Sequence, residues 1–359
     1  MAPETNSEPD QADTPAERER ERAHGLRPTM RDVAGLADVS LSTVSRVISG
    51  IQVAPELAER VTRAIAMLGY RHNAVAGNLR RSSRLSASIG VIFEDVSNPF
   101  FSAIYRGAED VARNRSVFIF GGSSDEEPLQ ERQLVDAFLA RQVDGLVIVP
   151  ASGDHSYLAH DARAGVPLVF VDRPPRFLDA DTVLSDNGGG ARTAVSYLLD
   201  AGHRRVAFIG DSAEIFTGAE RLKGYRRALA DHGVPPDDAL IRHVGFRAAD
   251  AKTTTEALLA GAAPPTALFT AQNLITVAAL RVLHRLGLER SVALAGIDDV
   301  PLADIVNPSV TVVAQDPYEM GRQAAELLFS RLDGYNGPSR RLILPTTLVE
   351  RDSGRVRPR

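Results

Sequence analysis

The chain has 359 residues, of which 44% are hydrophobic and 24% are charged. This composition is typical of a globular protein, and the length predicts two or three domains. The absence of cysteine excludes disulfides, thiolate zinc sites and a cysteine nucleophile. No stretch has the ~18 consecutive apolar residues of a membrane span, and the N-terminal region lacks the apolar core of a signal peptide. We therefore expect a cytoplasmic protein with no membrane partner.

The net charge of −5 is distributed unevenly along the chain. Residues 1–28 carry a balance of −3, residues 29–85 a balance of +4, and the remaining residues a balance of −6. A small basic segment joined to a larger acidic body indicates contact with a polyanion at one end of the chain only.

The first 28 residues are rich in Pro, Glu, Asp, Ala and Arg and hold almost no large apolar side chain. Such a segment cannot bury enough apolar surface to offset the entropy of ordering. We therefore predict a disordered tail over residues 1–28.

The apolar residues between positions 29 and 70 recur with helical spacing and predict three short helices in one small unit. Thr29 and Ser40 are suitable N-caps for the first two helices. Asp38 tolerates the left-handed conformation that a tight turn between them requires. Pro55 opens the third helix near its first position, and Gly69 ends it.

Helix, tight turn and helix form the helix-turn-helix pattern, in which the second helix enters the major groove of DNA. The second helix here, LSTVSRVIS, carries hydroxyls and one arginine on its outward positions. Hydroxyls bond phosphates or base edges, and arginine can bind guanine through two hydrogen bonds. The alternative is a structural bundle with ordinary solvated residues. The predicted outward positions are Leu41, Ser42, Thr43, Ser45, Arg46 and Ser49.

Beyond a linker at residues 71–85, short apolar runs typical of buried strands alternate with helical patterns. This alternation predicts parallel sheets covered by helices on both faces. About 270 residues are too many for one sheet, so we expect two α/β subdomains. The predicted strands are Ile89–Phe93, Val117–Phe120, Gly145–Val149, Leu168–Val171, Val206–Ile209, Ala267–Thr270 and Val292–Gly296. The predicted helices are Phe101–Arg113, Leu129–Arg141, Gly190–Ala201, Arg221–His232, Thr253–Ala260 and Asn273–Leu286.

Signatures of common enzymes are missing from the sequence. It contains no dinucleotide or P-loop fingerprint, no serine-hydrolase elbow and no zinc-protease motif. The glycines at 188–190 lack the fingerprint spacing and predict a tight strand-to-helix turn, and the eight histidines are scattered. We therefore expect neither catalytic residues, a metal nor a cofactor, although an α/β enzyme with a convergent site stays open as an alternative.

The segments MRDVAGLADVSLSTVSRVISG and APELAERVTRAIAMLGYRHNAVAGNLR resemble the DNA-binding region of the LacI/GalR (lactose-repressor) family. The resemblance continues from IGVIFEDVSNPFF through RQVDGLVIVP, GVPLVFVDR, AGHRRVAFIGD, RLKGYRRAL, PTALFTAQN and AGIDDVPLADIVNPSVTVV to MGRQAAELLF. So many ordered matches over ~320 residues are far more specific than one short motif. The resemblance implies a homodimeric, sequence-specific transcriptional regulator of double-stranded DNA, and we expect a repressor of a palindromic operator.

The resemblance also assigns the linker. It implies a hinge helix at residues 73–80, with Leu79 inserted into the minor groove so that the operator is kinked. Asn73, Ala76 and Thr29 complete the predicted set of DNA contacts.

By the same resemblance the core is periplasmic-binding-protein-like, with a small effector between two doubly wound parallel-sheet subdomains. The implied N-subdomain comprises about residues 86–185 and 316–334, and the C-subdomain about residues 186–315 and 341–350. The domain order is then a tail (1–28), a helix-turn-helix headpiece (29–72), a hinge and linker (73–85), the core (86–351) and a C-terminal tail (352–359).

The positions that match the family's effector cleft suit a polyhydroxylated ligand. Asp and Asn bond hydroxyls, Arg forks them, and aromatic rings cover the apolar face of a sugar. Ile215 stands where purine-binding relatives carry an arginine, which favours a neutral sugar. Singly, each position has a structural alternative, such as a helix cap or a core residue. The implied contacts are Asn98, Phe100, Phe101, Asp172, Thr217, Arg221, Phe246, Gln272, Asn273 and Asp298.

A second alternative is a sugar-binding receptor of the same fold that acts in transport. The missing signal peptide and the attached three-helix unit argue against it. Binding to a palindromic duplex from beside the gene would separate a regulator from both alternatives.

Overall fold

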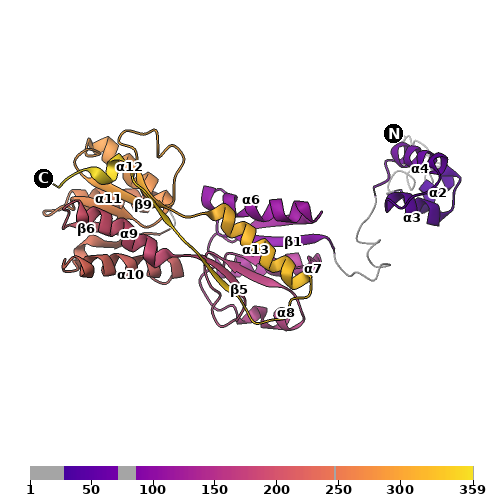
Figure 1. Cartoon of the computed structure of the whole chain (residues 1–359), viewed down its shortest axis with the longest axis horizontal. Helices are drawn as coiled ribbons and strands as arrows, with labels where there is room; N and C mark the ends of the chain where they lie inside the picture. Colours follow the sequence, from indigo (N-terminus) through magenta and orange to yellow (C-terminus); the bar gives the residue numbers. More distant parts are fainter. Residues whose placement is uncertain (1–27, 72–85, 246–247, 359) are drawn as a thin grey trace, which may run out of the picture. The chain divides into compact units, whose positions relative to one another are not determined.

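The computed structural model describes residues 28–71, 86–245 and 248–358 (Figure 1). The chain divides into two units, residues 1–84 and 85–359. Several predictions fall outside the described residues. They are the tail up to residue 27, the hinge helix with Asn73, Ala76 and Leu79, and the effector contact Phe246.

The first unit contains the three predicted helices, α2 (Met30–Ala37), α3 (Leu41–Ile48) and α4 (Pro55–Leu68). All three contribute to one apolar core, which is built from Val33, Ala37, Val44, Val61 and Ala64. The apolar spacing thus positions the helices as the sequence predicts, because each stripe has a partner to pack against.

Local signals at the helix ends confirm the predicted caps. Thr29 and Asp32 form a reciprocal capping box at the start of α2, and the Ser40 side chain accepts from the backbone N–H of Thr43. Asp38 adopts a left-handed conformation with φ of 48°, and Gly69 ends α4 with φ of 62°. The local sequence therefore determines the tight turn between α2 and α3.

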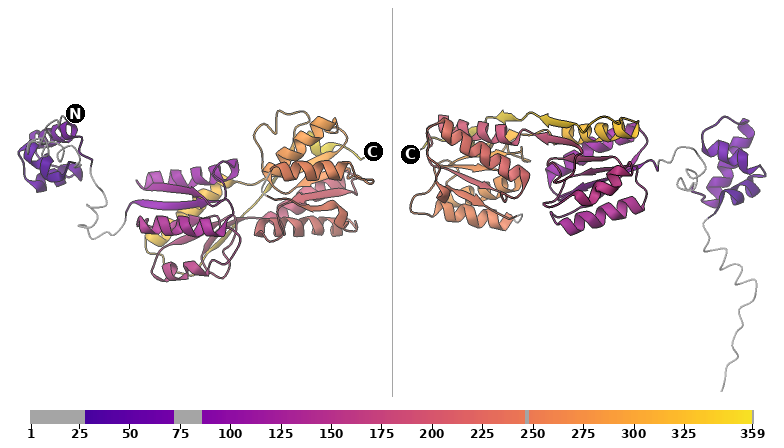
Figure 2. Two further views of the ribbon diagram at one scale, coloured as in Figure 1. Left: turned by 180° about the vertical axis from the view of Figure 1, so that it is seen from behind. Right: turned by 90° about the horizontal axis from the view of Figure 1, so that it is seen from below.

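The second unit begins with a sheet of order β11-β5-β4-β3-β1-β2, in which all pairings are parallel. α6 (Pro99–Asn114) and α13 (Pro317–Leu332) cover one face, and α7 (Pro128–Ala140) covers the other with α8 (Ala159–Arg163) nearby (Figure 2). Buried apolar strands covered on both faces match the predicted doubly wound arrangement. The strands are β1 (Ser88–Phe93), β2 (Phe118–Ser123), β3 (Leu146–Ile148), β4 (Leu168–Val171), β5 (Asp181–Ser185) and β11 (Arg341–Leu344).

The second sheet has the order β12-β10-β9-β8-β6-β7 and is parallel except for the pairing of β10 with β12. α9 (Asn187–Asp200) and α10 (Phe216–Asp231) cover one face, and α11 (Ala248–Leu259) and α12 (Asn273–Leu286) cover the other (Figure 1). The strands are β6 (Val206–Gly210), β7 (Ile241–His243), β8 (Ala267–Thr270), β9 (Ala293–Ile297), β10 (Thr311–Ala314) and β12 (Thr347–Val349).

The seven predicted strands and six predicted core helices all form, with ends shifted by a few residues. The apolar patterns missed the strands β5, β7, β10, β11 and β12 and the helices α8 and α13. Most of the missed strands are short and lie at sheet edges, where residues such as those of β11 are only half-buried. Edge strands carry weaker hydrophobic patterns than central ones, which explains the omission.

Within the described residues the chain passes between the sheets three times, after β5, after β10 and after β11. The third passage corrects one predicted boundary. Residues 341–344 pair with β5 in the first sheet, so their assignment to the C-subdomain is wrong. Of the predicted C-subdomain segment 341–350, only the part that forms β12 joins the second sheet.

The predicted C-terminal tail at 352–359 is also corrected for the part that is described. Residues 352–355 form a short 3-10 helix, and Ser353 is only 2% exposed. The Ser353 hydroxyl donates to the Leu294 carbonyl (2.7 Å), and His203 Nε2 lies 2.8 Å from the Val356 carbonyl oxygen. This segment therefore completes the second subdomain.

Two glycines set the close approach of α6 and α13, which lie side by side in Figure 2. A Cβ on Gly321 would lie 1.9 Å from the carbonyl oxygen of Ile104, and a Cβ on Gly107 would lie 2.0 Å from that of Tyr318. Backbone atoms cannot rotate away as side chains can, so the helices must separate if either glycine gains a methyl group.

We expect Gly321→Ala to lower the free energy of unfolding by about 1–3 kcal/mol, because the added methyl group overpacks this contact. Urea denaturation followed by circular dichroism measures the change. Gly188→Ala in α9 is the matched control, since its Cβ would meet nothing closer than 3.6 Å. Equal stabilities of the two variants would contradict the close contact.

Candidate functional site

The outward face of α3 is accessible to a partner. Val44 is buried against the headpiece core, whereas Leu41, Ser42, Ser45 and Arg46 are exposed. Thr43 and Ser49, which complete the predicted set, are partly buried. The helix therefore presents hydroxyls and one guanidinium on a single face, which is the composition that groove contacts use.

Two of the predicted contact residues also hold the helix starts. The Thr29 hydroxyl donates to Asp32 Oδ2 (2.7 Å), and the Thr43 and Ser40 hydroxyls are hydrogen-bonded at 2.8 Å. Arg46 donates to the carbonyl oxygen of Gln52 (3.1 Å), which keeps its guanidinium near the end of α3. This bond uses one of the five N–H donors of the Arg46 guanidinium.

The turn between α2 and α3 is fixed from α4. Arg60 donates to the carbonyl oxygen of Asp38 (2.7 Å) and forms an ion pair with its carboxylate (3.0 Å). The ion pair is exposed and adds little stability, but the carbonyl bond ties the third helix to the turn. The angle between α2 and α3 is thus set by all three helices.

The core contains a polar cavity at the carboxyl ends of both parallel sheets. Nine of the ten predicted effector positions line it, the tenth being Phe246, which is not described. Glu94, Asp172, Asp211 and Asp298 directly follow β1, β4, β6 and β9. The residues are Glu94, Asn98, Phe100, Phe101, Asp172, Arg173, Asp211, Thr217, Arg221, Gln272, Asn273 and Asp298. Ligands of open α/β sheets bind at such strand ends.

Three lining residues were not predicted from the sequence: Glu94, Arg173 and Asp211. Glu94 and Asp211 are the first residues after their strands, and Arg173 is the second residue after β4. The rule that strand ends line the cavity would have found them. The resemblance did not indicate them, because it assigned effector contacts only at positions that match the family's cleft pattern.

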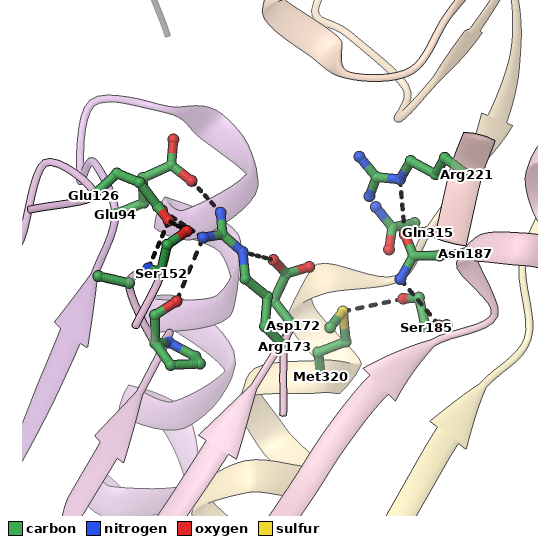
Figure 3. A network of polar contacts seen from close by, with 12 residues as sticks. Glu94, Glu126, Ser152, Asp172, Arg173, Ser185, Asn187, Arg221, Gln315 and Met320 are labelled. Atoms are coloured by element: carbon green, nitrogen blue, oxygen red, sulfur yellow. Dashed lines mark hydrogen bonds and ion pairs between the residues drawn. The ribbon is translucent and has the colours of Figure 1, made fainter. Parts of the chain in front are cut away.

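Arg173 organises the first side of this cavity (Figure 3). Its guanidinium forms ion pairs with Glu94 and Glu126, and its Nε lies 3.3 Å from Asp172 Oδ2. Burial lowers the pKa of Arg173, but the carboxylates of Glu126, Glu94 and Asp172 raise it above its ordinary value. The arginine therefore stays charged and neutralises part of a buried acidic cluster.

The carboxyl groups resist ionisation because they are buried together. Burial raises the pKa of Glu94 to about 7 despite the opposing charge of Arg173. Burial likewise raises the pKa of Asp211 to about 6, although Arg221 and Arg173 favour its charged form. The pKa values of Asp172 and Asp298 are also raised by burial. Four carboxyl groups and only two guanidinium groups line the cavity, so it attracts hydrogen-bond donors.

Arg221 organises the opposite side and is also buried. Its Nε donates to Asn187 Oδ1 (2.7 Å) and its Nη1 to the Ala271 carbonyl oxygen (2.7 Å). Asn187 in turn donates to the Ser185 carbonyl (3.2 Å) at the end of β5 (Figure 3). The guanidinium is thus connected by hydrogen bonds to the segment after β5, where the chain first passes from one sheet to the other.

Two asparagines join the subdomains at the edge of the cavity. The Asn273 amide donates to Asn98 Oδ1 (2.7 Å), and the reverse bond is 3.4 Å long. Asn98 also caps α6, and Gln272 caps α12. These predicted effector positions therefore have structural roles as well.

The cavity is small, with a volume of about 20 Å³. That is room for a single water molecule. A larger ligand therefore enters only when the lining side chains or the two subdomains move apart.

Within residues 28–71, 86–245 and 248–358, no group of His, Asp and Glu side chains is arranged to hold a metal ion. No helix in those ranges combines the length and apolar character needed to cross a bilayer.

Two family models match the chain. Residues 29–73 match the bacterial regulatory proteins of the lacI family, and residues 195–354 match a periplasmic binding protein-like domain. The HTH-type transcriptional regulator CelR of Thermobifida fusca is 35% identical over 336 residues, which cover 91% of this chain and 98% of CelR. The chain belongs to the LacI family. It is a sequence-specific DNA-binding transcriptional regulator, and α2 and α3 are its helix-turn-helix.

Solved LacI-family structures share this architecture. A transcriptional regulator CelR–cellobiose complex is 33% identical, with a TM-score of 0.68, and the match covers 91% of this chain and 100% of that one. The lac repressor dimer bound to operator and the anti-inducer ONPF has a TM-score of 0.80 at 24% identity, over 92% and 99% of the two chains. The second likeness shows the fold alone.

We expect Arg173→Met to lower the free energy of unfolding by about 3–5 kcal/mol at neutral pH, because it leaves buried carboxylates unpaired. The deficit should shrink as the pH falls from alkaline values towards about 7, because Arg173 lowers the pKa of Glu94 and its removal lets the variant take up this proton at a higher pH than the wild type. Urea denaturation at several pH values measures both effects.

Arg176→Met serves as the control for this variant. Arg176 is exposed, and among the contacts described its side chain donates only to the Glu214 carbonyl oxygen (2.8 Å), so the loss of this side chain should change stability by about 0.5 kcal/mol or less. A similar loss in both variants would show that the Arg173 cluster does not carry the predicted charge compensation.

Proposed function

We propose that this LacI-family chain is a repressor whose affinity for a palindromic operator is controlled by a sugar bound in the cavity of its core. One observation carries the proposal. The same chain joins an exposed helix with DNA-contact chemistry to a polar cavity at the strand ends of two parallel sheets. A regulator needs both parts, whereas a transport receptor needs only the second.

The lining of the cavity supports a sugar. Carboxylates and amides bond hydroxyl groups in both directions, and Arg221 can donate two or more bonds. Phe100 and Phe101 form an edge-to-face pair with ring centroids 5.2 Å apart, which offers an apolar wall for a sugar ring. The solved CelR relative is described as a cellobiose complex, which agrees with this class of ligand.

The three passages between the sheets supply a route for control. A ligand shifts an equilibrium only if it binds two forms of the protein with different affinity. A ligand in this cavity contacts side chains from both subdomains, so its free energy of binding depends on how far the subdomains are closed. The distance between the subdomains is then the variable that the operator-binding part responds to.

We also propose that the protein works as a homodimer, because a palindromic operator has the two-fold symmetry of a dimer. Exposed apolar side chains are available on the core for such a contact. Phe118 on the edge strand β2 is 78% exposed, and Ile305 is 70% exposed. Large exposed apolar groups are suited to a subunit interface.

We propose, finally, that the chain has no catalytic activity and acts in the cytoplasm, where the chromosome lies. Its relatives are transcriptional regulators, and the buried carboxylates of the cavity are explained by ligand binding without a reaction.

Gel shifts with a palindromic duplex from upstream of the gene test the proposal at the DNA. If Arg46 reads a guanine, Arg46→Ala should cost on the order of 1–3 kcal/mol at that base pair and relax specificity there. Binding should also fall steeply with salt, so all comparisons need one fixed salt concentration. The control is Arg63→Ala, which removes one positive charge at an exposed position of α4.

Uniform weakening of Arg46→Ala on operator and scrambled duplex would place its guanidinium on a phosphate. Failure of the wild-type chain to distinguish the two duplexes would overturn the repressor itself.

Asp298→Asn tests the cavity. Asp298 adopts a left-handed backbone with φ of 69°, which Asn also tolerates, and its Oδ1 accepts from Gln315 (2.6 Å). We expect operator affinity near that of the wild type but loss of release by the sugar that releases wild-type protein. The neighbouring Asp299→Asn, at an exposed carboxylate that forms an ion pair with Arg351 outside the cavity lining, should keep the response. A normal response in Asp298→Asn contradicts the assignment.

A further inference from the structure

Asp211 is a buried carboxylate that lacks a bonding partner. It directly follows β6, lines the cavity and is only 7% exposed. Across the described ranges, no hydrogen-bond donor or ion-pair partner contacts its carboxylate; Arg221 and Arg173 act on it only through longer-range charge. A buried polar group without a protein partner costs free energy, so a donor group of a ligand that reaches this carboxylate in the cavity would be stabilising.

The charges around Asp211 are not balanced by the protein. Arg173 already serves Glu94, Glu126 and Asp172, and Arg221 donates to an amide and a backbone carbonyl. Asp211 and Glu94 also repel each other, and this repulsion contributes to the raised pKa of Glu94. An additional positive charge in the cavity would remove an unfavourable interaction that neither arginine removes.

Glu94 and Asp211 come from different subdomains. Glu94 follows β1 of the first sheet, and Asp211 follows β6 of the second. Without a cation their repulsion favours separation of the two sheets. With a cation between them, both carboxylates attract the same group, and closure becomes favourable.

We propose that Glu94 and Asp211 form an acidic subsite that binds a protonated amine of the effector, so that the ligand is an amino sugar or a similar polyhydroxylated amine. This inference rests on the proposed function of the cavity and names the chemical class of its ligand. Neither residue is among the positions that the resemblance assigns to the effector. The sequence favoured a neutral sugar on the strength of Ile215, and it did not indicate that these two carboxylates line the same cavity.

An ammonium group fits the subsite better than a hydroxyl group. An ionised carboxylate only accepts hydrogen bonds, and an ammonium group only donates them. A hydroxyl group and an ammonium group can each donate a charge-assisted bond to an ionised carboxylate, but only the ammonium group adds the attraction of a full opposite charge. A hydroxyl group could fill the same space, but it would leave the excess negative charge uncompensated.

The subsite makes binding depend on pH with a defined sign. Burial raises the pKa values of Glu94 to about 7 and of Asp211 to about 6, so both carry protons in mildly acidic solution. An ammonium ligand binds their ionised forms, and its affinity must therefore rise from about pH 5.5 to about pH 7. The charged groups that act on the pair are Arg173, Arg221, Glu126 and Asp172.

Isothermal titration calorimetry on the full chain tests the proposal with three matched pairs of sugars. The pairs are glucosamine with glucose, galactosamine with galactose and mannosamine with mannose, each differing only in ammonium or hydroxyl at one carbon. We expect at least one amine to bind about 10-fold or more tightly than its neutral partner near pH 7. Its affinity should fall as the pH is lowered to about 5.5, while that of the neutral partner should not.

Asp211→Asn should remove most of the preference for the amine, while the affinity for the neutral partner stays within about 3-fold. This variant is expected to fold, because no bond of the Asp211 side chain is lost, and its melting temperature should equal or exceed that of the wild type. Glu214→Gln is the matched control. It removes one negative charge from the same loop, but Glu214 is exposed and outside the cavity lining, so the preference should be unchanged.

Equal or tighter binding of the neutral sugar in every pair overturns the proposal, as does failure of all three amines to bind. A preference that survives Asp211→Asn also overturns it. Operator gel shifts on the same preparations keep the outcomes apart: intact operator binding with no amine preference rejects only the subsite, whereas loss of operator discrimination rejects the proposed function.

Discussion

The ion-pair cluster at Arg173 is the interaction on which the functional core depends. Three carboxylates surround one buried guanidinium, and a charge of this kind is stable inside a protein only when its partners are in place. Glu126 also accepts from the backbone and the hydroxyl of Ser152, so the cluster fixes the loop after β3. A polar cavity can exist beside the apolar sheet because the arginine offsets part of its acidity.

The parallel arrangement of the sheets explains why so many polar groups meet. Every parallel strand ends at the same edge, so residues far apart in the sequence are delivered to one place. Asn98 and Asn273 are 175 positions apart in the chain and bond each other directly. Hydrogen bonds from Arg221 to Asn187 and from Asn187 to Ser185 connect the lining of this cavity to the first passage of the chain between the sheets.

The helix-turn-helix unit follows different physics. Its fold depends on helix caps and on a small apolar core formed by three short helices. Several side chains on its contact face are exposed and available to a partner. Thr29 and Thr43 are among the exceptions, because the Thr29 hydroxyl caps α2 and the Thr43 hydroxyl bonds the capping hydroxyl of Ser40. Their contribution to DNA binding would therefore come through the position of the helices as well as through contact.

The sequence by itself determined what depends on neighbouring residues. The left-handed turn at Asp38, the caps at Thr29 and Ser40 and the buried runs of the central strands are local patterns, and each has the predicted form. The tertiary structure alone decided which sheet each late segment joins. The strand at 341–344 pairs with β5 of the first sheet. Ser353 is buried as part of the second subdomain. Likewise, Glu94 follows a strand of the first sheet and Asp211 a strand of the second, and only the fold brings both to one cavity. Burial and long-range charge depend on packing between distant segments, and a local pattern carries no record of that packing.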